Sequence, residues 1–469
     1  MPINTTDSLP IPLTEVAAFT ARRTMDLHAA HINSIFPRSA EPLKLLRRYV
    51  RAEGMYLWDD DGARYHDFFN GFGCLNLGHN HPRVTAALRD ALDASLPMIH
   101  QLSPSPYEAA LAHNLAALLP PELSVSYFQN SGSEAVEAAI KLARIATGRR
   151  AVVSAINAYH GRTLGALSLT GMPHYSRPFE PLLPEAEQLP FGDAAAIERR
   201  LARGDVAALF LEPIQGQGGV HVPDDSYLTR ARELCSRHGT LLVFDEVQTG
   251  FGRTGRLFAF EHAGAVPDVL LTSKSLGGGL MPLSAITTSE RVWTKAYGTL
   301  KRFVLHGSTF SGNTLACVAG LAALEAIVEE RLAERAAEQG QYFFSRLAEL
   351  KTRHPCIKEV RGRGLMIGII FDLGSWNPLS GLSHVLIDAI SPKIVTAYLA
   401  SRLLNEHRII VPPSLTDEYL LRVYPVLAIT RDQIDYFVDA LDQVCGSIGR
   451  YDQVLLDVVP RLIRSQARS

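Results

Sequence analysis

The chain has 469 residues, which is long enough to bury a large core, so one large domain with a smaller one is the expected organisation. Its 46 basic and 48 acidic residues give a formal net charge of −2, which offers no electrostatic reason to expect nucleic acid or an anionic membrane as a partner. The five scattered cysteines form no CxxC pair, and no apolar run approaches the roughly 18 residues of a membrane helix, so we expect a soluble cytoplasmic protein that acts on small molecules.

The first third of the chain predicts an arm followed by a small meander. Residues 1 to about 50 mix polar, proline and basic residues without a clear period until LKLLRRYV, and we expect them to lie on a larger body. In the segment GMYLWDDDGARYHDFF, short apolar runs are interrupted by Asp-Gly, which is a hairpin signal. A small antiparallel meander is predicted there.

The remainder predicts two regions of different architecture. Between about 75 and 330, β-rich runs alternate with helical patterns, which is typical of a mainly parallel sheet covered by helices. These runs are VSYFQ, AVVSA, AALFLE, TLLVFDE and VLLTS. From about 335, a helix, the strand-like IKEVRGRGLMIGIIF, another helix and EYLLRVYPVLAIT indicate a smaller α+β domain. We expect 1–75 to form the arm and part of the small domain, 76–332 the large domain, and 333–469 the C-terminal small domain.

Two polar residues follow neighbouring predicted strands. Asp245 ends the buried run TLLVFDE, and Lys274 follows VLLTS just before three glycines. The carboxyl ends of strands are where α/β sheets bind ligands, although a lone Asp there is more often a cap or turn former and a lone Lys is often a surface residue. The pair favours a cofactor that needs an amine to bind it and an anion to keep its pyridine nitrogen protonated.

A third segment, VSYFQNSGSEAVEAAIKLAR, predicts a strand, a turn of small residues and a helix. Ser131 and Glu134 have the spacing of a capping box. A helix start offers free backbone N–H groups, so Ser131, Gly132 and Ser133 could hold a phosphate, although the segment taken alone is only a well-capped helix. His79 and His81 have no further ligand residues in their motif, and no metal site is expected.

With EPIQGQGGV, LLVFDEVQTGFGRTG, TSKSLGGGLMPLSA and HGSTFSGN in this order and with these separations, the chain resembles the class III aminotransferases, the ornithine, acetylornithine and ω-amine transaminase group. The resemblance extends from about residue 45 to residue 435. It implies a fold-type-I α/β transferase that uses pyridoxal 5'-phosphate (PLP), with active sites shared in a homodimer or a dimer of dimers.

The resemblance also implies cofactor-binding and catalytic roles. Lys274 would hold PLP as a Schiff base and move the proton, and Asp245 would pair with the ring nitrogen. Gln248 would lie near the phenolic oxygen, and Tyr159 would stack on the cofactor face. The Ser131–Ser133 turn would bind the phosphate, and Thr309 would reach the phosphate of the neighbouring subunit's cofactor.

Substrate-binding roles come from the same resemblance. Arg162 matches a position that holds a substrate carboxylate in some members, but an arginine equally often pairs with a structural acid. Glu212 resembles a site-lining glutamate and could also be a buried hydrogen-bonding residue. Arg422 resembles the arginine that binds the α-carboxylate of glutamate or 2-oxoglutarate.

Two departures from the family pattern bear on the substrate. Gln217 replaces a glutamate that neutralises the family arginine when the substrate lacks an α-carboxylate, and an amide cannot cancel that charge. Phe72 replaces the tyrosine with which ornithine transaminases receive the α-amino group, and a buried ammonium without a partner is costly. A diamine, an ω-amino acid or a long-chain amine is therefore the expected donor to a 2-oxo acid. An acetylornithine-type transaminase, an isomerase on the same scaffold and a non-catalytic binding protein remain alternatives.

Overall fold

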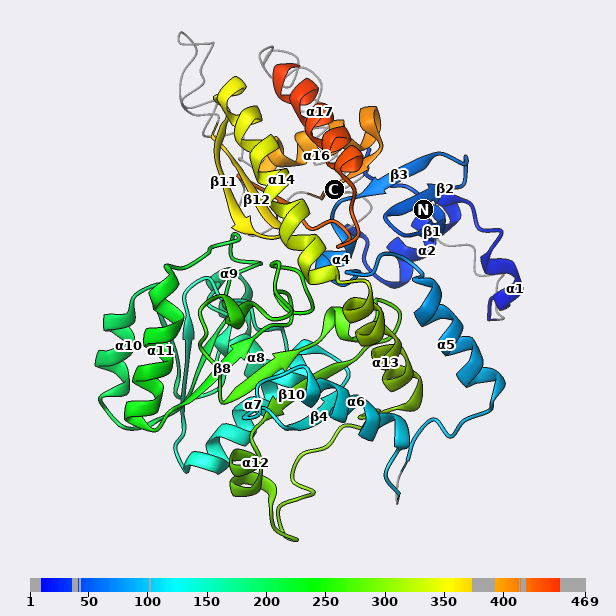
Figure 1. The fold of residues 1–469 in the computed structure, drawn as a ribbon. Helices are drawn as coiled ribbons and strands as arrows, with labels where there is room; N and C mark the ends of the chain where they lie inside the picture. The colour runs from blue at the N-terminus through cyan, green and yellow to red at the C-terminus, as the bar shows by residue number, and fades with distance from the viewer. Residues whose placement is uncertain are drawn as a thin grey trace.

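The computed structural model describes residues 10–35, 41, 44–100, 103–372, 393–412, 414 and 419–447. Its centre is a seven-stranded sheet of order β4-β10-β9-β8-β7-β5-β6 (Figure 1). The strands are β4 (Val125–Gln129), β5 (Ala151–Ala155), β6 (Ala186–Leu189), β7 (Val206–Leu211), β8 (Leu241–Asp245), β9 (Val269–Thr272) and β10 (Ser284–Thr288). The β5–β6, β5–β7, β7–β8 and β8–β9 pairs are parallel, whereas β10 is antiparallel to both β4 and β9.

The five strands of this sheet that the sequence predicts are all present, and two more were not predicted. β7, β8 and β9 are buried at every position, so their apolar runs stand out in the sequence. β6 reads AEQL and β10 reads SAITT, which are short and partly polar. Neither has the apolar run or the alternation from which a strand can be predicted.

Helices cover both faces of the large sheet. They are α5 (Pro82–Asp93), α6 (Pro106–Ala117), α7 (Gly132–Thr147), α8 (Leu164–Leu169), α9 (Pro173–Ser176), α10 (Ala194–Leu201), α11 (Asp225–His238), α12 (Glu290–Tyr297) and α13 (Thr314–Glu329). Alternate residues of β8 belong to different cores. Leu241 and Val243 pack with α7, α8 and α12, and Leu242 and Phe244 pack in the core that contains α10, α11 and α13.

Segments from both ends of the chain form the smaller sheets. The predicted meander is present as β1 (Tyr49–Glu53), β2 (Tyr56–Asp59) and β3 (Arg64–Asp67), and β13 (Ile409–Ile410) joins it parallel to β3. Before it lie α1 (Leu13–Val16) and α2 (Ala21–His31), and after it the short α4 (Asn70–Gly73). The boundaries expected at residues 75 and 332 stay predictions.

The expected single strand IKEVRGRGLMIGIIF is wrong in one respect, because the segment forms a hairpin. β11 (Ile357–Arg363) and β12 (Met366–Phe371) are antiparallel, and β14 (Leu420–Val423) pairs with β12. Gly364 makes the turn with φ 59°, and a Cβ there would lie 2.4 Å from the carbonyl carbon of Thr254. Helices α14 (Leu332–Arg353), α16 (Lys393–His407) and α17 (Arg431–Ser447) lie near this sheet (Figure 1).

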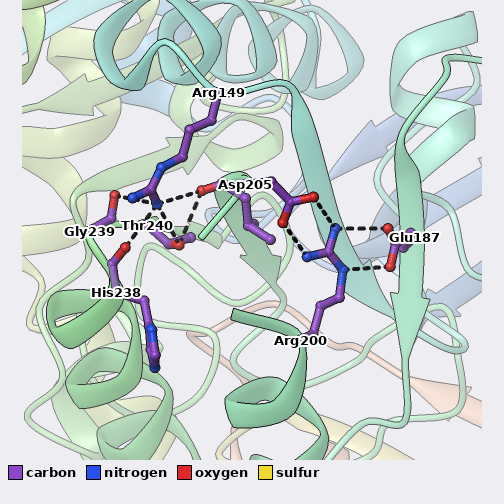
Figure 2. A network of polar contacts seen from close by, with 8 residues as sticks. Arg149, Glu187, Arg200, Asp205, His238, Gly239 and Thr240 are labelled. Carbon is purple, nitrogen blue, oxygen red and sulfur yellow. Dashed lines mark hydrogen bonds and ion pairs between the residues drawn. The ribbon is translucent and has the colours of Figure 1, made fainter. Parts of the chain in front are cut away.

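Arginine networks fix the edge of the large sheet that lies away from the cavity (Figure 2). Arg200 of α10 donates to both carboxylate oxygens of Glu187 and of Asp205, which ties β6 to the turn before β7. Arg149 donates to the carbonyls of His238 and Gly239, at the end of α11, at 2.9 and 3.0 Å. Because these arginines hydrogen-bond to neighbouring carboxylates and carbonyls of the same chain, we assign them a structural role.

Candidate active site

A cavity of about 690 Å³ lies at the carboxyl edge of the large sheet. The loops that follow β4, β5, β7, β8 and β9 converge there, as expected for ligand sites in α/β proteins. The predicted site residues that line it are Phe72, Ser131, Gly132, Ser133, Tyr159, Arg162, Glu212, Asp245, Gln248 and Lys274. Gln217 lines it as well, whereas Thr309 and Arg422 do not.

Lys274 presents a buried amine to this cavity. It follows β9 and starts the 3₁₀ turn η3 (Lys274–Gly277), with φ 45°. Burial lowers the pKa of the amine and the Arg422 charge lowers it further, while Cys74, Asp245 and Glu212 act in the opposite direction. No hydrogen bond or ion pair to Lys274 is found within the described ranges, so its amine is available to a ligand at the end of the strand.

Asp245 is held in place by a residue that the sequence analysis missed. His160 Nδ1 lies 2.8 Å from Asp245 Oδ2, and the backbone N–H of Val247 donates to Oδ1 at 3.1 Å. Burial lowers the pKa of His160, but the hydrogen bond and charge of Asp245, together with the charge of Glu212, raise it overall. His160 directly follows Tyr159 in the segment NAYHGRT, and this position next to a predicted cofactor-binding residue is a sequence signal that could have pointed to it.

The Ser131 turn starts α7, as predicted, but the capping box is only half formed. Ser131 Oγ accepts from the Glu134 N–H at 3.3 Å, whereas the Glu134 carboxylate accepts from the Asn130 N–H at 2.7 Å instead of from Ser131. The first amides of a helix have no acceptor within the helix, so this turn is a ready anion site. A Cβ at Gly132 would lie 3.1 Å from Val247, which keeps the position small.

Tyr159 and Gln248 are oriented by their neighbours. The Tyr159 N–H donates to Glu212 Oε2 at 3.0 Å, and its ring meets that of Tyr175 edge-on with centroids 6.0 Å apart. Gln248 Nε2 donates to the Phe72 carbonyl at 2.8 Å. Both side chains line the cavity beside Asp245.

Arg162 has no acidic partner among the described residues. Its guanidinium carbon lies 4.5 Å from the ring centroid of Tyr175, and its backbone N–H donates to Ser133 Oγ at 3.3 Å. The alternative that it pairs with a structural acid is therefore not supported by any contact in the described ranges. The guanidinium remains able to bind a carboxylate.

Glu212 fits both readings of its role, since it lines the cavity and is also a buried hydrogen-bond acceptor. It is 6% exposed and accepts hydrogen bonds from the backbone N–H groups of Tyr159 and Gly216. Burial and, less strongly, the charge of Asp245 raise its pKa to about 7, against the opposing effect of His160. Its protonation therefore changes near neutral pH.

Arg422 and Phe72 form one end of the site. Arg422, in β14, is 2% exposed, and its Nη1 donates to Gln217 Oε1. Its guanidinium carbon lies 5.7 Å from the Phe69 ring centroid and 5.8 Å from that of Phe72. Gln217 thus separates the guanidinium from the cavity.

Thr309 is exposed and does not reach the cavity of its own chain. Its neighbour Ser308 accepts a hydrogen bond from Asn130 Nδ2 at 3.0 Å. His79 and His81 bind different carboxylates, those of Asp67 and Glu330. The described residues contain no group of three side chains suited to a metal ion, and none of their helices has the length and hydropathy that a membrane span requires. The cytoplasmic location stays a prediction.

The cavity suits PLP on its own chemistry. A buried amine that has no partner in the described part of the chain, a buried carboxylate and the first amides of a helix match the cofactor's aldehyde, pyridinium and phosphate groups. The three groups come from the ends of β9, β8 and β4.

Comparisons with known proteins agree with this chemistry. A model of the class III aminotransferases matches residues 37–445. The chain is 38% identical over 461 residues to aminotransferase PigE of Serratia sp., a match of 91% of the chain and 54% of PigE, so it spans about half the length of that relative. It is 40% identical over 386 residues to a putrescine aminotransferase of Pectobacterium atrosepticum, covering 80% of the chain and 77% of that protein. The crystal structure of an ornithine aminotransferase from Toxoplasma gondii is similar with a TM-score of 0.80 and 31% identity, covering 92% of this chain and 96% of that one.

The predicted family, fold type and cofactor are thereby confirmed, as is the prediction of a transaminase. Two of these names state a substrate, putrescine in one and ornithine in the other, so the comparisons leave the amine donor open. The chain belongs to the class III aminotransferases, a family of PLP-dependent enzymes.

Proposed function

We propose that this enzyme transfers an amino group from a terminal primary amine, such as a diamine, an ω-amino acid or a long-chain amine, to a 2-oxo acid. The observation that carries the proposal is the apolar end of the cavity. Phe72 lines it and packs edge-on against Phe69, with ring centroids 4.5 Å apart. An aromatic wall offers no hydrogen-bond acceptor to an α-ammonium group, whereas it fits the carbon chain of a terminal amine. The putrescine aminotransferase relative supports the same class of donor.

Each cofactor-facing residue has a specific task in this proposal. PLP, when bound, supplies a carbonyl carbon that takes up the amino group and a ring that accepts electron density. Lys274 would hold the cofactor, and its amine would carry the proton, because burial lowers the pKa of this amine. Asp245, oriented by His160, would hold the protonated ring nitrogen. Tyr159 would stack on the ring, and Gln248 would bind near the phenolic oxygen.

The acceptor would be bound by arginines. Arg162 and Arg422 have no carboxylate partner within the described ranges, and both lie at or next to the cavity. A 2-oxo acid brings one or two carboxylates, which an arginine can bind through two parallel hydrogen bonds. Glu212 lines the same cavity and accepts a hydrogen bond from the Gly216 N–H, next to Gln217 in the chain.

A transaminase of the acetylornithine type is the second candidate. The absence of an acidic partner for Arg162 among the described residues favours it, because such substrates carry an α-carboxylate that an arginine can bind. Phe72 disfavours ornithine itself.

We also propose that the working enzyme is at least a dimer with shared sites. The segment around Thr309 exposes large apolar side chains, with Leu300 89%, Phe303 62% and Val304 66% exposed. Apolar clusters of this kind are typical of protein interfaces. A second chain covering them would bring Thr309 toward a neighbouring phosphate.

The test is a spectral titration of the purified holoenzyme. Single amines are added without acceptor, namely putrescine, cadaverine, ornithine, a β- or γ-amino acid, alanine and glutamate. The proposal expects the visible band of the bound cofactor to disappear with the terminal amines. An intact band with all of them would contradict amino transfer and favour an isomerase, and a band lost only with α-amino acids would favour the second candidate.

A further inference from the structure

Two tyrosine rings lie against the guanidinium group of Arg162. Its carbon is 4.5 Å from the ring centroid of Tyr175 and 5.9 Å from that of Tyr159. Both distances are within the roughly 6 Å over which an aromatic face attracts a cation. Among the described residues no carboxylate pairs with this guanidinium, so its N–H donors can still bind an anion.

Tyr175 contacts Arg162 without being part of the cavity wall. Tyr159 and Arg162 line the cavity, whereas Tyr175 does not. The Tyr175 ring also meets the rings of Tyr159 and His174, with centroids 6.0 and 4.1 Å apart. Its hydroxyl has no hydrogen-bond partner in the described part of the chain. The ring rather than the hydroxyl therefore makes the contacts, and any effect of Tyr175 on a ligand has to act through a neighbour.

Backbone contacts fix the place of the Tyr175 ring. The Gly171 N–H donates to the Ala158 carbonyl at 2.9 Å, and the His160 N–H donates to Thr170 Oγ1 at 3.1 Å. These bonds join the loop after β5, which carries the arginine, to the segment that leads into α9, which carries Tyr175. The ring is therefore in place before any substrate binds.

We infer that Tyr175 is a positioning residue that holds the Arg162 guanidinium at the cavity, where it binds a carboxylate at the far end of the amine donor. An aromatic face attracts the cation without using its N–H donors, whereas an acidic partner would compete with the carboxylate of the substrate. The inference rests on the proposed function and deepens it, since it selects ω-amino acids over uncharged amines among the proposed donors.

Two donors with the same number of carbons separate the carboxylate from the rest of the substrate. These donors are γ-aminobutanoate, which ends in a carboxylate, and n-butylamine, which ends in a methyl group. Mixing each with the holoenzyme in the absence of an acceptor, and following the loss of the cofactor band by stopped flow, gives a dissociation constant and a maximal rate.

The substitution Tyr175→Leu removes the aromatic face and keeps an apolar side chain. We expect the dissociation constant of γ-aminobutanoate to rise about tenfold, which is within the range of a cation–π contact. Its maximal rate, and both quantities for n-butylamine, should stay within about twofold of the wild type. Tyr175→Phe keeps the ring and should restore binding, because the hydroxyl has no partner. Tyr175→Met replaces Tyr175→Leu if the latter unfolds at a lower temperature than the wild type.

Arg162→Leu provides the matched control, since Tyr175 is inferred to act through Arg162. In that background Tyr175→Leu should not raise the dissociation constant of γ-aminobutanoate any further, because two residues that share one contact do not have additive effects. The Arg162 N–H also donates to Ser133 Oγ in the predicted phosphate turn. A fluorescence titration of the apoproteins with PLP should therefore show equal affinity in the wild type and in Tyr175→Leu.

Three results would overturn the inference. An unchanged dissociation constant of γ-aminobutanoate in Tyr175→Leu would mean that the ring does not hold Arg162. An equal loss for both donors, or a loss that persists in the Arg162→Leu background, would mean that Tyr175 is only structural. A weaker affinity for PLP would assign Arg162 to the cofactor phosphate. Failure of the proposed function is seen separately, as a cofactor band that both donors leave intact in the wild type. The dissociation constant of pentanoate, a carboxylate that cannot react, then compares the same variants.

Discussion

Replacing His160 by leucine would remove the partner of the Asp245 carboxylate while keeping a similar volume. The His160 side chain is fully buried and Asp245 is 6% exposed, with 2.8 Å between Nδ1 and Oδ2. Breaking one side of a buried charged pair typically costs about 3–5 kcal/mol. We expect a loss of that size in the free energy of unfolding of the apoprotein near pH 6. In His160→Gln, where an amide can still donate to Asp245, we expect a loss of about 1–3 kcal/mol.

The direction of the His160 pKa shift also predicts how this difference in stability changes with pH. The pKa of His160 is raised in the folded protein, because the effects of Asp245 and Glu212 outweigh that of burial. A group that binds its proton more tightly in the folded state stabilises the folded protein. This contribution to the free energy of unfolding is fully present below the unfolded pKa of 6.5, and it is lost as the pH rises through the higher folded pKa. The difference between the wild type and His160→Leu should therefore be larger at pH 6 than at pH 9.

Urea unfolding of the apoproteins, followed by circular dichroism at pH 6 and pH 9, measures both quantities. A cofactor titration would show in addition a weaker affinity for PLP in His160→Leu, because Asp245 is no longer oriented. If the free energy of unfolding of His160→Leu lies within about 0.5 kcal/mol of the wild type at both pH values, the pair does not hold Asp245 and the reasoning is refuted.

Three further predictions concern the site. Phe72→Tyr adds a hydroxyl to the apolar wall and should raise kcat/KM for ornithine about tenfold relative to putrescine; an unchanged ratio would mean that Phe72 does not contact the donor. Gly161→Ala should weaken PLP binding about tenfold in a fluorescence titration, since Gly161 has φ 130° and a Cβ there would lie 2.1 Å from Ser133 Oγ. An affinity equal to that of the wild type would mean that Ser133 does not contribute to phosphate binding. Mixed refolding of Lys274→Ala and Thr309→Ala chains should recover up to about a quarter of wild-type activity if the sites are shared, because one site of a mixed dimer is then intact and the other carries both changes; no recovery would argue for sites built from one chain.

The parallel core of the large domain could be predicted from the sequence because its strands are buried on both faces. Their apolar runs, such as LLVF before Asp245, are visible without any tertiary information. The strands β6 and β10 carry polar residues, and it is the pairing with the neighbouring strands β5 and β9 that places them in the sheet. The β11–β12 hairpin escaped prediction because its turn consists of only two residues, Gly364 and Leu365, within an otherwise continuous strand-like run.

The site divides in the same way. Lys274, Asp245 and the Ser131 turn follow strands, and the local order of the sequence is enough to predict that they meet at one edge of the sheet. His160 became recognisable only when folding brought it to Asp245, 85 residues away in the chain. The half-formed capping box likewise depends on Asn130, which captures the Glu134 carboxylate.

The sequence by itself determined the family and the cofactor, and it predicted most of the residues that line the cavity, because these depend on short motifs at the ends of strands. The tertiary structure decided which charges are neutralised. In the folded chain His160 lies within hydrogen-bond distance of Asp245, and Arg422 donates a hydrogen bond to the Gln217 amide. Arg162 has no acidic partner among the described residues. Burial and contact between distant segments set the electrostatic energy of each group, and neither can be read from the order of residues along the chain.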